Sequence, residues 1–280
     1  TLSFPRFRSC PILCCCSMLC LQFLRNRFSI SIRNVVHIDG EIVEMREKTG
    51  ESRLIDSFGR EITYLRISVT NRCNLYCRYC RPHDCVFTDN REDTLTVNQI
   101  AEVVHVAADL GIRKIRLTGG EPLVRADILR IVESISACNG IEHVAMTTNG
   151  VLLPGYAAGL REAGLDSLNI SLDSLDSKRY ESITGIRALE KVLRGISAAK
   201  NEGFPIKINM VVSNDTTDQE IESIREFCKT HGLMPQLIDH YDLHSTKRDD
   251  YTLDRPPKCA ECNRIRLLAD GVLKPCLHSN

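Results

Sequence analysis

Six cysteines fall into two sets of three whose spacing suits metal binding. They are Cys73, Cys77, Cys80, Cys259, Cys262 and Cys276. Thiolates bind zinc or iron–sulfur clusters, and a structural zinc site takes four ligands. His83 or Cys85 could complete such a site in the first set, and His278 in the second. A four-iron cluster on three thiolates would instead leave one iron open to a small molecule, so the spacing alone leaves both chemistries open.

Further polar motifs follow the first cysteine set. GGEP (119–122) combines two glycines, which let backbone approach a ligand closely, with the carboxylate of Glu121 and a rigid proline. TTNG (147–150) and SLD (171–173) come later in the chain. Their polar side chains suit a ligand site or a loop turn equally well. Each motif ends an apolar stretch, which indicates that strands present them.

Strands and helices alternate from residue 61 onward. β-Branched and aromatic residues predict six strands, and apolar residues at helical spacing predict a helix after each strand but the last. The predicted strands cover 63–70, 114–120, 143–150, 166–173, 205–213 and 235–239, and the helices 97–111, 126–137, 156–163, 188–203 and 218–232. This alternation implies an α/β fold with parallel strands. We expect a partial (β/α)6 TIM-like barrel with its chemistry at the carboxyl ends of the strands. An open doubly wound sheet is the alternative.

Composition limits the function classes. Lys plus Arg and Asp plus Glu both number 36, so no overall charge draws the chain toward nucleic acid. An anionic ligand would therefore need local cations. The 14 cysteines are clustered, which favours metal-bound thiolates in a reducing compartment over a disulfide framework.

Residues 1–50 form an Arg- and Cys-rich leader that we place outside the barrel. Residues 1–38 contain no Asp or Glu, which is typical of a mitochondrial presequence, with a secretory signal as the rival. The apolar run CPILCCCSMLCLQFL is shorter than the ~20 residues of a membrane-spanning helix, so no stable membrane insertion is expected. The predicted location is the mitochondrial matrix if the leader is a presequence, and the cytoplasm otherwise.

Five cations could hold an anionic substrate. Arg66 and Arg116 lie on the first two predicted strands, and Lys207 lies on the fifth. Arg264 and Arg266 are separated by one residue, so an extended backbone points both to the same side. Guanidinium groups can grip phosphate oxygens with two hydrogen bonds. These cations would suit a phosphate-bearing substrate, and the alternative is that each arginine is a solvated surface charge.

The segment CNLYCRYC, followed by GGEP at the second strand end, resembles the radical S-adenosylmethionine (SAM) superfamily. The resemblance implies that Cys73, Cys77 and Cys80 hold a [4Fe–4S] cluster whose open iron binds SAM. Electron transfer then cleaves the sulfonium and gives a 5′-deoxyadenosyl radical, so the cofactor carries the hard chemistry. The residues that the resemblance assigns to SAM contacts are Tyr79, Gly120 and Ser171.

A closer resemblance covers residues 56 to about 239 and 259 onward. YLRISVTNRCNLYCRYC, KIRLTGGEPLVR, TTNG, NISLD, IKINMVV and CNRIRLLADGVLKPCL, in this order, are similar to the GTP 3′,8-cyclase family of molybdenum cofactor biosynthesis. The resemblance implies a lyase that converts GTP to (8S)-3′,8-cyclo-7,8-dihydroguanosine 5′-triphosphate, with a second [4Fe–4S] cluster on Cys259, Cys262 and Cys276. It assigns GTP contacts to Arg66, Arg116, Thr147, Lys207, Arg264, Ile265 and Arg266. It also implies a reductant, a downstream cyclic pyranopterin monophosphate synthase and a homodimer.

The chain departs from this family after the last predicted strand. The family has Met where Tyr241 stands, and a much longer stretch where 242–258 forms a charged loop before the cluster segment at 259–280. The family's C-terminal tail is also absent. These differences indicate an internal deletion and a truncation around a barrel at 56–241. Two alternatives to the cyclase remain: a noncatalytic metal-binding isoform of the barrel, and a radical SAM enzyme with an auxiliary cluster and a different substrate.

Overall fold

The structure is a computed structural model that describes residues 35–38, 41–48, 51–56, 59–80, 94–240 and 261–275. Its main element is an eight-stranded sheet in the order β11-β10-β4-β5-β6-β7-β8-β9. The strands are β4 (Tyr64–Ser68), β5 (Lys114–Thr118), β6 (His143–Thr148), β7 (Ser167–Ser171), β8 (Ile206–Val212), β9 (Met234–Asp239), β10 (Arg264–Leu267) and β11 (Leu273–Lys274). Neighbouring strands from β10 to β9 are parallel, and β11 pairs antiparallel with β10.

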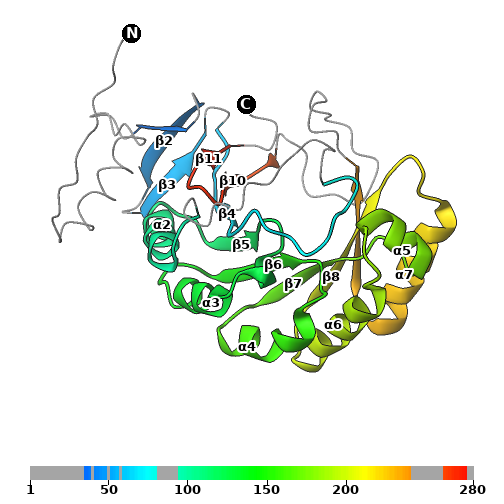
Figure 1. The fold of residues 1–280 in the computed structure, drawn as a ribbon. Helices are drawn as coiled ribbons and strands as arrows, with labels where there is room; N and C mark the ends of the chain where they lie inside the picture. Colours follow the sequence, from blue (N-terminus) through cyan, green and yellow to red (C-terminus); the bar gives the residue numbers. More distant parts are fainter. Residues whose placement is uncertain are drawn as a thin grey trace, which may run out of the picture.

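The six predicted strands follow one another across this sheet in sequence order. A doubly wound sheet would reverse direction at a switch point, so the order excludes that alternative and confirms the expected partial barrel. The helices lie along the outer side of the curved sheet (Figure 1). They are α2 (Val97–Asp109), η2 (Pro122–Val124), α3 (Ile128–Ser136), η3 (Leu153–Gly155), α4 (Ala157–Glu162), α5 (Ser177–Thr184), α6 (Leu189–Asn201) and α7 (Asp218–His231).

Helix α5 was not predicted from the sequence, although its ends carry recognisable signals. The side chain of Asp176 caps its N-terminus by accepting from the backbone N–H of Arg179 at 2.7 Å. Gly185 closes its C-terminus in the left-handed conformation, with φ of 74°. The helix has few apolar residues, so the search for apolar periodicity did not find it. Its two caps stabilise it despite this composition.

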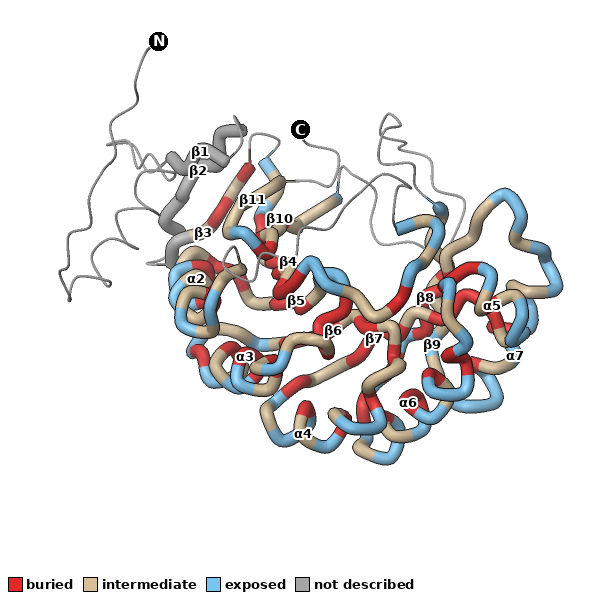
Figure 2. Tube along the Cα trace, in the orientation of Figure 1, coloured by how far each residue is buried: buried red, intermediate tan, exposed pale blue. Residues whose placement is uncertain are grey.

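The two faces of the sheet differ in chemistry because successive strand residues point to opposite sides. On β4 and β5, Leu65, Ile67, Ile115 and Leu117 are buried against the helices, as the buried segments in Figure 2 indicate. The opposite face, here called the inner face, is largely polar. Its polar residues include Tyr64, Arg66, Ser68, Lys114, Arg116, Thr118, Thr147, Asn169, Ser171, Lys207, Asn209, Gln236, Arg264 and Arg266, and Ala145, Val211, Met234 and Ile238 are apolar positions of the same face. A closed TIM barrel fills this space with branched apolar side chains, so the polar inner face indicates a ligand chamber.

A small antiparallel sheet precedes the barrel. It consists of β1 (Val35–Ile38), β2 (Glu41–Lys48) and β3 (Glu51–Ile55), in that order. The backbone N–H of Ile62 donates to the carbonyl of Leu54 at 2.8 Å, and Leu54 is part of the core. Two strands thus lie within residues 1–50, which the sequence assigned to the leader, so the proposed boundary falls inside this sheet.

The end of the described chain also joins the barrel. β10 pairs with β4 from Arg264 to Leu267, so the start of the predicted cluster segment extends the main sheet. The predicted charged loop at 242–258 lies outside the described residues. None of the described helices is long and apolar enough to cross a bilayer.

Candidate functional site at the carboxyl ends of the strands

The first cysteine set lies on the loop that follows β4. This cysteine loop (residues 71–80) is tied to the end of helix α5 by two backbone bonds. The N–H of Tyr76 donates to the carbonyl of Thr184 at 2.8 Å, and the N–H of Arg78 donates to that of Ile183 at 3.0 Å. The loop therefore takes its shape from a helix that the sequence analysis missed.

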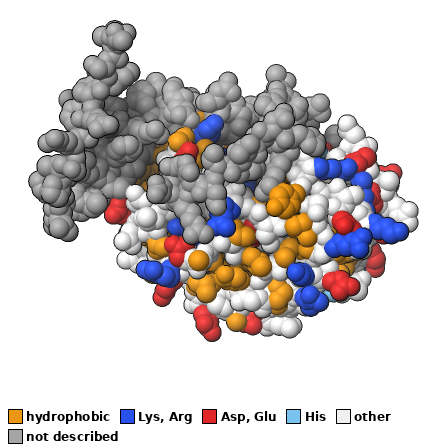
Figure 3. Space-filling view, viewed as in Figure 1, with side chains coloured by type: hydrophobic (Ala, Val, Ile, Leu, Met, Phe, Trp, Pro, Cys, Tyr) orange, Lys and Arg blue, Asp and Glu red, His pale blue; other side chains and the backbone are white. Residues whose placement is uncertain are grey.

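Charged side chains fasten the outer side of the same loop. Arg78 contacts Asp215 at 2.6 Å, and Arg179 bridges Asp215 at 3.1 Å and Glu220 at 2.8 Å. Arg179 lies on α5 and Glu220 on α7, whereas Asp215 precedes α7. Figure 3 shows basic and acidic side chains interspersed on this part of the surface. Hydrogen bonds from Ser213 first, then from Arg179 and Arg78, hold the pKa of Asp215 well below its usual range. This network joins the cysteine loop to the loop that follows β8.

The glycine pair of GGEP brings the loop after β5 against the cysteine loop. The N–H of Gly120 donates to Thr70 at 2.8 Å, and the N–H of Glu121 donates to Arg72 at 2.8 Å. A Cβ on Gly119 would lie 2.3 Å from the carbonyl oxygen of Thr70, and one on Gly120 2.2 Å from that of Arg72. The sequence analysis expected these glycines to make room for a ligand. In the structure they make room for the cysteine loop.

The carboxylate of Glu121 accepts hydrogen bonds within the protein, although the sequence analysis proposed it as a group that contacts a ligand. It is 1% exposed and accepts from Leu123 N at 3.1 Å, Thr148 Oγ1 at 2.6 Å and Asn149 N at 2.6 Å. Burial raises the pKa of Glu121, and these three hydrogen bonds act against that rise. The side chain fixes the TTNG loop relative to the loop after β5.

The TTNG loop in turn contacts the first cysteine. Asn149 Nδ2 donates to Cys73 Sγ at 3.9 Å and to Asn74 Oδ1 at 2.7 Å. The backbone N–H of Leu75 also points at Cys73 Sγ, at 3.5 Å. Hydrogen bonds to sulfur stabilise thiolate ligands and tune clusters. Three thiols on one loop, with donors aimed at one sulfur, fit an iron–sulfur cluster.

The thiols of the first set lie near one another. Burial, followed by the neighbouring Cys80, Asp173 and Cys73, raises the pKa of Cys77 to about 12. The three cysteines are thus close enough to influence one another's charge. Within the part of the chain that the structure describes, no three His, Cys, Asp or Glu side chains converge on one point as single-ion ligands must. A cluster is larger than one ion and does not require such convergence.

The residues predicted to contact SAM come from the carboxyl ends of three strands, β4, β5 and β7. Tyr79 lies on the cysteine loop, Gly120 follows β5, and Ser171 ends β7 on the inner face. The hydroxyl of Tyr79 donates to Asp173 Oδ2 at 2.7 Å, and Asp173 Oδ1 accepts from Val211 N at 2.8 Å. Asp173, which sequence reasoning left undecided, therefore ties the cysteine loop to β8.

The predicted cations gather on the inner face. Arg266 is in register with Arg66, and Arg66 with Arg116. Burial is the main cause that lowers the pKa of Arg66 to about 9. The charges of Arg266, Arg116 and Arg264 lower it further, and Tyr64 has the opposite effect. Arg66 Nε is buried and has no hydrogen-bond partner among the described residues. Such crowding of like charges is unfavourable without an anion, which indicates the kind of ligand that this face accepts.

Thr147 and Lys207 also belong to this face, but Ile265 does not. Thr147 Oγ1 accepts from Arg116 at 3.4 Å, and Lys207 is in register with Asn169. The side chain of Ile265 is buried in the core on the opposite side of β10. Its neighbours on the strand point inward because residues alternate, so the side chain of Ile265 faces away from them. The GTP contact assigned to Ile265 stays a prediction.

The second cysteine set is described only at Cys262, which is half-buried and carries a free thiol. Cys259 and Cys276 lie outside the described residues. Burial alone would raise the pKa of Cys262, but the backbone N–H and guanidinium of Arg264 outweigh it and lower that pKa. This thiol thus lies beside the cations of the inner face.

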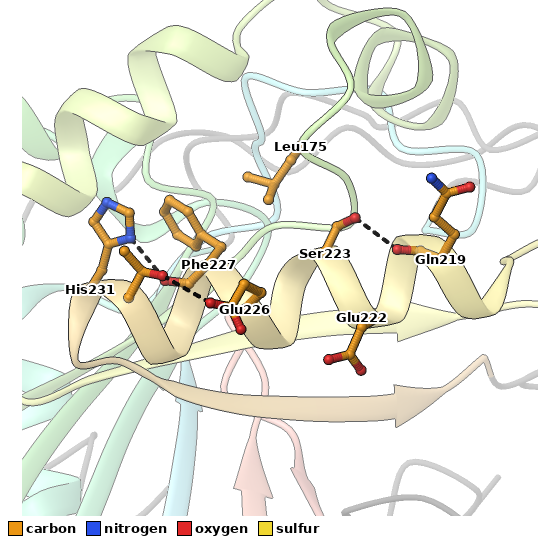
Figure 4. Close-up of a pocket in the computed structure, with 8 residues that line it drawn as sticks. Leu175, Gln219, Glu222, Ser223, Glu226, Phe227 and His231 are labelled. Carbon is orange, nitrogen blue, oxygen red and sulfur yellow. Dashed lines mark hydrogen bonds between the residues drawn. The ribbon is translucent and has the colours of Figure 1, made fainter.

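A groove of about 500 Å³ lies away from these residues, on the outer surface of α7 (Figure 4). Leu175 faces Phe227 there, and acidic Glu222 and Glu226 line one side. His231 Nδ1 is bonded to the carbonyl of Phe227 at 2.8 Å, within its own helix. The groove contains none of the cysteines or inner-face cations, so we place the functional site at the strand ends.

Comparisons with known proteins identify the class of this site. Residues 67–228 match the radical SAM superfamily. The SuiB structure from Streptococcus suis, bound to S-adenosylmethionine, aligns with a TM-score of 0.62 and 16% identity over 79% of this chain and 59% of that chain. Methylornithine synthase (PylB) aligns with a TM-score of 0.53 and 16% identity over 65% of this chain and 54% of that one. The chain thus spans less than two thirds of either protein, and the likeness shows a shared fold.

Closer relatives identify the family. A GTP 3′,8-cyclase from Peptoclostridium acidaminophilum is 37% identical over 275 residues, covering 82% of this chain and 85% of that protein. Molybdenum cofactor biosynthesis protein 1 from Drosophila melanogaster is 36% identical over 82% of this chain and 48% of that protein. This chain therefore belongs to the GTP 3′,8-cyclase family of the radical SAM superfamily, whose members use a [4Fe–4S] cluster and SAM.

The alignment also bears on the predicted internal deletion. The alignment extends over 275 positions, but 82% of a 280-residue chain supplies fewer residues than that. The bacterial relative therefore carries, within the aligned region, residues that this chain lacks.

Proposed function

We propose that this protein acts as a GTP 3′,8-cyclase and converts GTP to (8S)-3′,8-cyclo-7,8-dihydroguanosine 5′-triphosphate for molybdenum cofactor biosynthesis. The observation that carries the proposal is the pairing of two features on one sheet. A three-cysteine loop lies at the carboxyl end of β4, and crowded arginines with an unpartnered Arg66 Nε line the inner face of the same strand. A polyanionic nucleotide is the substrate that this charge distribution fits.

The cysteine loop would hold the cofactors. Cys73, Cys77 and Cys80 would bind the [4Fe–4S] cluster, and the residues facing SAM would be Tyr79, Gly120 and Ser171. When bound, the reduced cluster and SAM supply a 5′-deoxyadenosyl radical for hydrogen abstraction. Two contacts keep the loop in position: the hydrogen bond from Tyr79 to Asp173 at 2.7 Å and the packing of Gly120. Neither contact involves a thiol, so all three thiols stay available for the cluster. The contribution of the protein is to bind and orient.

The inner face would hold the nucleotide. Arg66, Arg116, Lys207, Arg264 and Arg266 would neutralise the triphosphate, because guanidinium groups match phosphate oxygens with paired donors. Thr147 would add a hydroxyl beside Arg116. The unpartnered Nε of Arg66 supports this assignment, since a buried donor without an acceptor costs free energy until a ligand supplies one.

Further parts of the proposal concern the second cysteine set and the partners of the protein. Cys259, Cys262 and Cys276 would hold a second [4Fe–4S] cluster that faces the guanine. The lowered pKa of Cys262 supports it as a thiolate ligand. A reductant would load the first cluster, and a cyclic pyranopterin monophosphate synthase would take up the product. Homodimer formation and a mitochondrial matrix location stay predictions.

Anaerobic reconstitution tests the proposal. The full chain is loaded with iron and sulfide, reduced with dithionite and incubated with SAM and GTP. We expect 5′-deoxyadenosine to form in a GTP-dependent manner, together with the cyclic dihydroguanosine triphosphate, both detected by mass spectrometry. A colourless protein that binds zinc would favour the noncatalytic isoform. Equal 5′-deoxyadenosine with and without GTP, and no cyclic product, would favour another substrate.

A further inference from the structure

A chain of hydrogen-bonded side chains crosses the inner face. Arg116 on β5 donates from Nε to the hydroxyl of Tyr64 on β4, and from Nη1 to Asn169 Oδ1 on β7 at 2.6 Å. Asn169 Nδ2 donates to Asn209 Oδ1 on β8 at 3.1 Å and to Gln236 Oε1 on β9 at 3.2 Å. We call these five residues the inner chain. They join five strands of the sheet through one central amide.

The hydrogen bonds of Asn169 reach across more than one strand spacing. Neighbouring strands lie about 4.8 Å apart, so strands two positions apart in a flat sheet are separated by roughly twice that distance. Asn169 nevertheless bonds to Arg116 two strands away on one side and to Gln236 two strands away on the other. Its side chain is 7% exposed, and both of its amide N–H groups and its oxygen are used. Asn169 is therefore fixed in one orientation.

The inner chain also fixes the orientation of Arg116. A guanidinium group has five N–H donors in one plane. Nε bonds to Tyr64, and Nη1 bonds to Asn169 and to Thr147 at 3.4 Å. Nη2 has no hydrogen-bond partner among the residues that the structure describes. Protein groups thus hold the Nε and Nη1 sides of the guanidinium group, and its Nη2 side can bind a ligand.

Charge explains why such anchoring is needed. Arg66 and Arg116 pair in register, and the charge of Arg116 contributes to the lowered pKa of Arg66. An unanchored Arg116 side chain would swing away from this repulsion. Asn169 accepts a hydrogen bond without carrying charge, so it holds Arg116 without cancelling its positive charge. An aspartate there would form an ion pair and remove the attraction for an anion.

We propose that Tyr64 and Asn169 are positioning residues that hold Arg116 with its Nη2 edge toward the phosphate chain of the substrate. This inference rests on the proposed function, because it takes a phosphate-bearing nucleotide as the ligand of the inner face. Tyr64 contributes further through its ring, whose centroid lies 5.4 Å from the ammonium nitrogen of Lys114. Two cations of the inner face thus depend on one tyrosine.

Two variants separate positioning from general support of the fold. Tyr64→Phe removes one hydroxyl and keeps the ring, and Asn169→Asp keeps the size and adds a charge. Tyr156→Phe, at the start of α4, is the matched control. Binding of GTP, guanosine and inorganic triphosphate to the purified full chain is measured by calorimetry. We expect both inner-chain variants to weaken GTP and triphosphate binding roughly tenfold and to leave guanosine binding unchanged. Tyr64→Phe loses one hydrogen bond to Arg116, whereas the new carboxylate of Asn169→Asp pairs with Arg116 and offsets its charge.

The outcomes distinguish this inference from the proposed function. If the wild-type chain does not bind GTP, the proposed function fails first. If the wild-type chain binds GTP and both variants bind it equally well, the inference is overturned. A parallel loss of guanosine binding, or a lower melting temperature for Tyr64→Phe than for Tyr156→Phe, overturns it too, because the residues would then support the sheet itself. Should Asn169→Asp not fold, Tyr64→Phe decides alone.

Discussion

The cysteine loop and the inner face belong to the same sheet, but their polar groups differ in whether they find partners within the protein. Around the cysteine loop, polar groups find partners within the protein: the N–H groups of Tyr76 and Arg78 bond to α5, and Glu121 accepts three hydrogen bonds. On the inner face, like charges crowd together. Burial and neighbouring arginines lower the pKa of Arg66, and its Nε has no partner within the described chain.

This difference separates two ways of preparing a binding site. The cysteine loop is held by hydrogen bonds to its neighbours, so we expect it to be pre-organised for its ligand. The inner face keeps an excess of positive charge that only an anionic ligand can compensate, and it does so at the expense of folding stability. Substitutions in the two regions should therefore change stability and binding in different directions.

The largest effect is expected from Cys77→Ser in the cysteine loop. A serine hydroxyl does not replace a thiolate, so the chain should lose cluster iron and the GTP-dependent 5′-deoxyadenosine signal. The loss should exceed the roughly 10- to 100-fold that removal of an outer-shell partner costs a metal site. Iron per chain and visible absorption measure it. Cys138→Ala, in the core after α3, is the control. Full iron content in Cys77→Ser would remove the first cysteine set from the site.

The next largest effect is expected from Arg66→Met on the inner face. This variant should bind GTP more weakly but be more stable. GTP binding should weaken by roughly 10- to 100-fold, because a charged partner of the phosphates is lost. Without nucleotide, the melting temperature should rise by about 2–4 °C per kcal/mol of relieved repulsion. The sign follows from the pKa of Arg66, lowered from 12.5 to about 9: its protonated form is disfavoured by folding, and that cost is fully present at pH 7. A variant that loses both stability and affinity would contradict the comparison.

Sequence reasoning predicted the part of this comparison that depends on local pattern. It placed the cysteines, GGEP, TTNG and SLD at strand ends, and residue alternation put Arg264 and Arg266 on one face. The same alternation places the side chain of Ile265 in the core, so its assigned GTP contact stays a prediction. Strands β1 and β2 were missed because the acid-free, Arg-rich composition of the leader led us to exclude all of residues 1–50.

The rest depends on contacts between residues far apart in the chain. Nothing near Asn169 in the sequence indicates that it bonds to Arg116, which lies 53 residues away. The glycine pair was predicted correctly as a close approach, but what approaches it is the backbone of Thr70 and Arg72. Curvature of the sheet and the packing of loops decide such partners, and neither is written in a local pattern.

A smaller effect is expected from Asn149→Ala in the TTNG loop. Its amide donates to Cys73 Sγ at 3.9 Å, and hydrogen bonds to sulfur stabilise the reduced, more negative state of a cluster. The variant should keep its iron but show a more negative reduction potential, measured by spectroelectrochemistry. Asn139→Ala, in an exposed turn, provides the control. An unchanged potential would mean that Asn149 acts on the loop through Asn74 alone.

The smallest effect is expected from Asp215→Asn, which removes the ion pairs to Arg78 and Arg179. The pKa of Asp215 is lowered in the folded protein, so its contribution to stability is present above the unfolded pKa of about 3.9 and is lost as the pH falls further. The difference in melting temperature from wild type should be small at pH 7. It should shrink in high salt, because both side chains of the Arg78–Asp215 pair are largely exposed, and vanish in acid.

Glu226→Gln, which loses an exposed pair with Lys229, is the matched control for this variant. Iron content should stay at the wild-type level in both, because backbone bonds to Ile183 and Thr184 remain. Loss of iron from Asp215→Asn alone would mean that the surface charges, and not the end of α5, hold the cysteine loop in place. The loop would then depend on screened side-chain contacts, and it could no longer be contrasted with the inner face as the pre-organised half of the site.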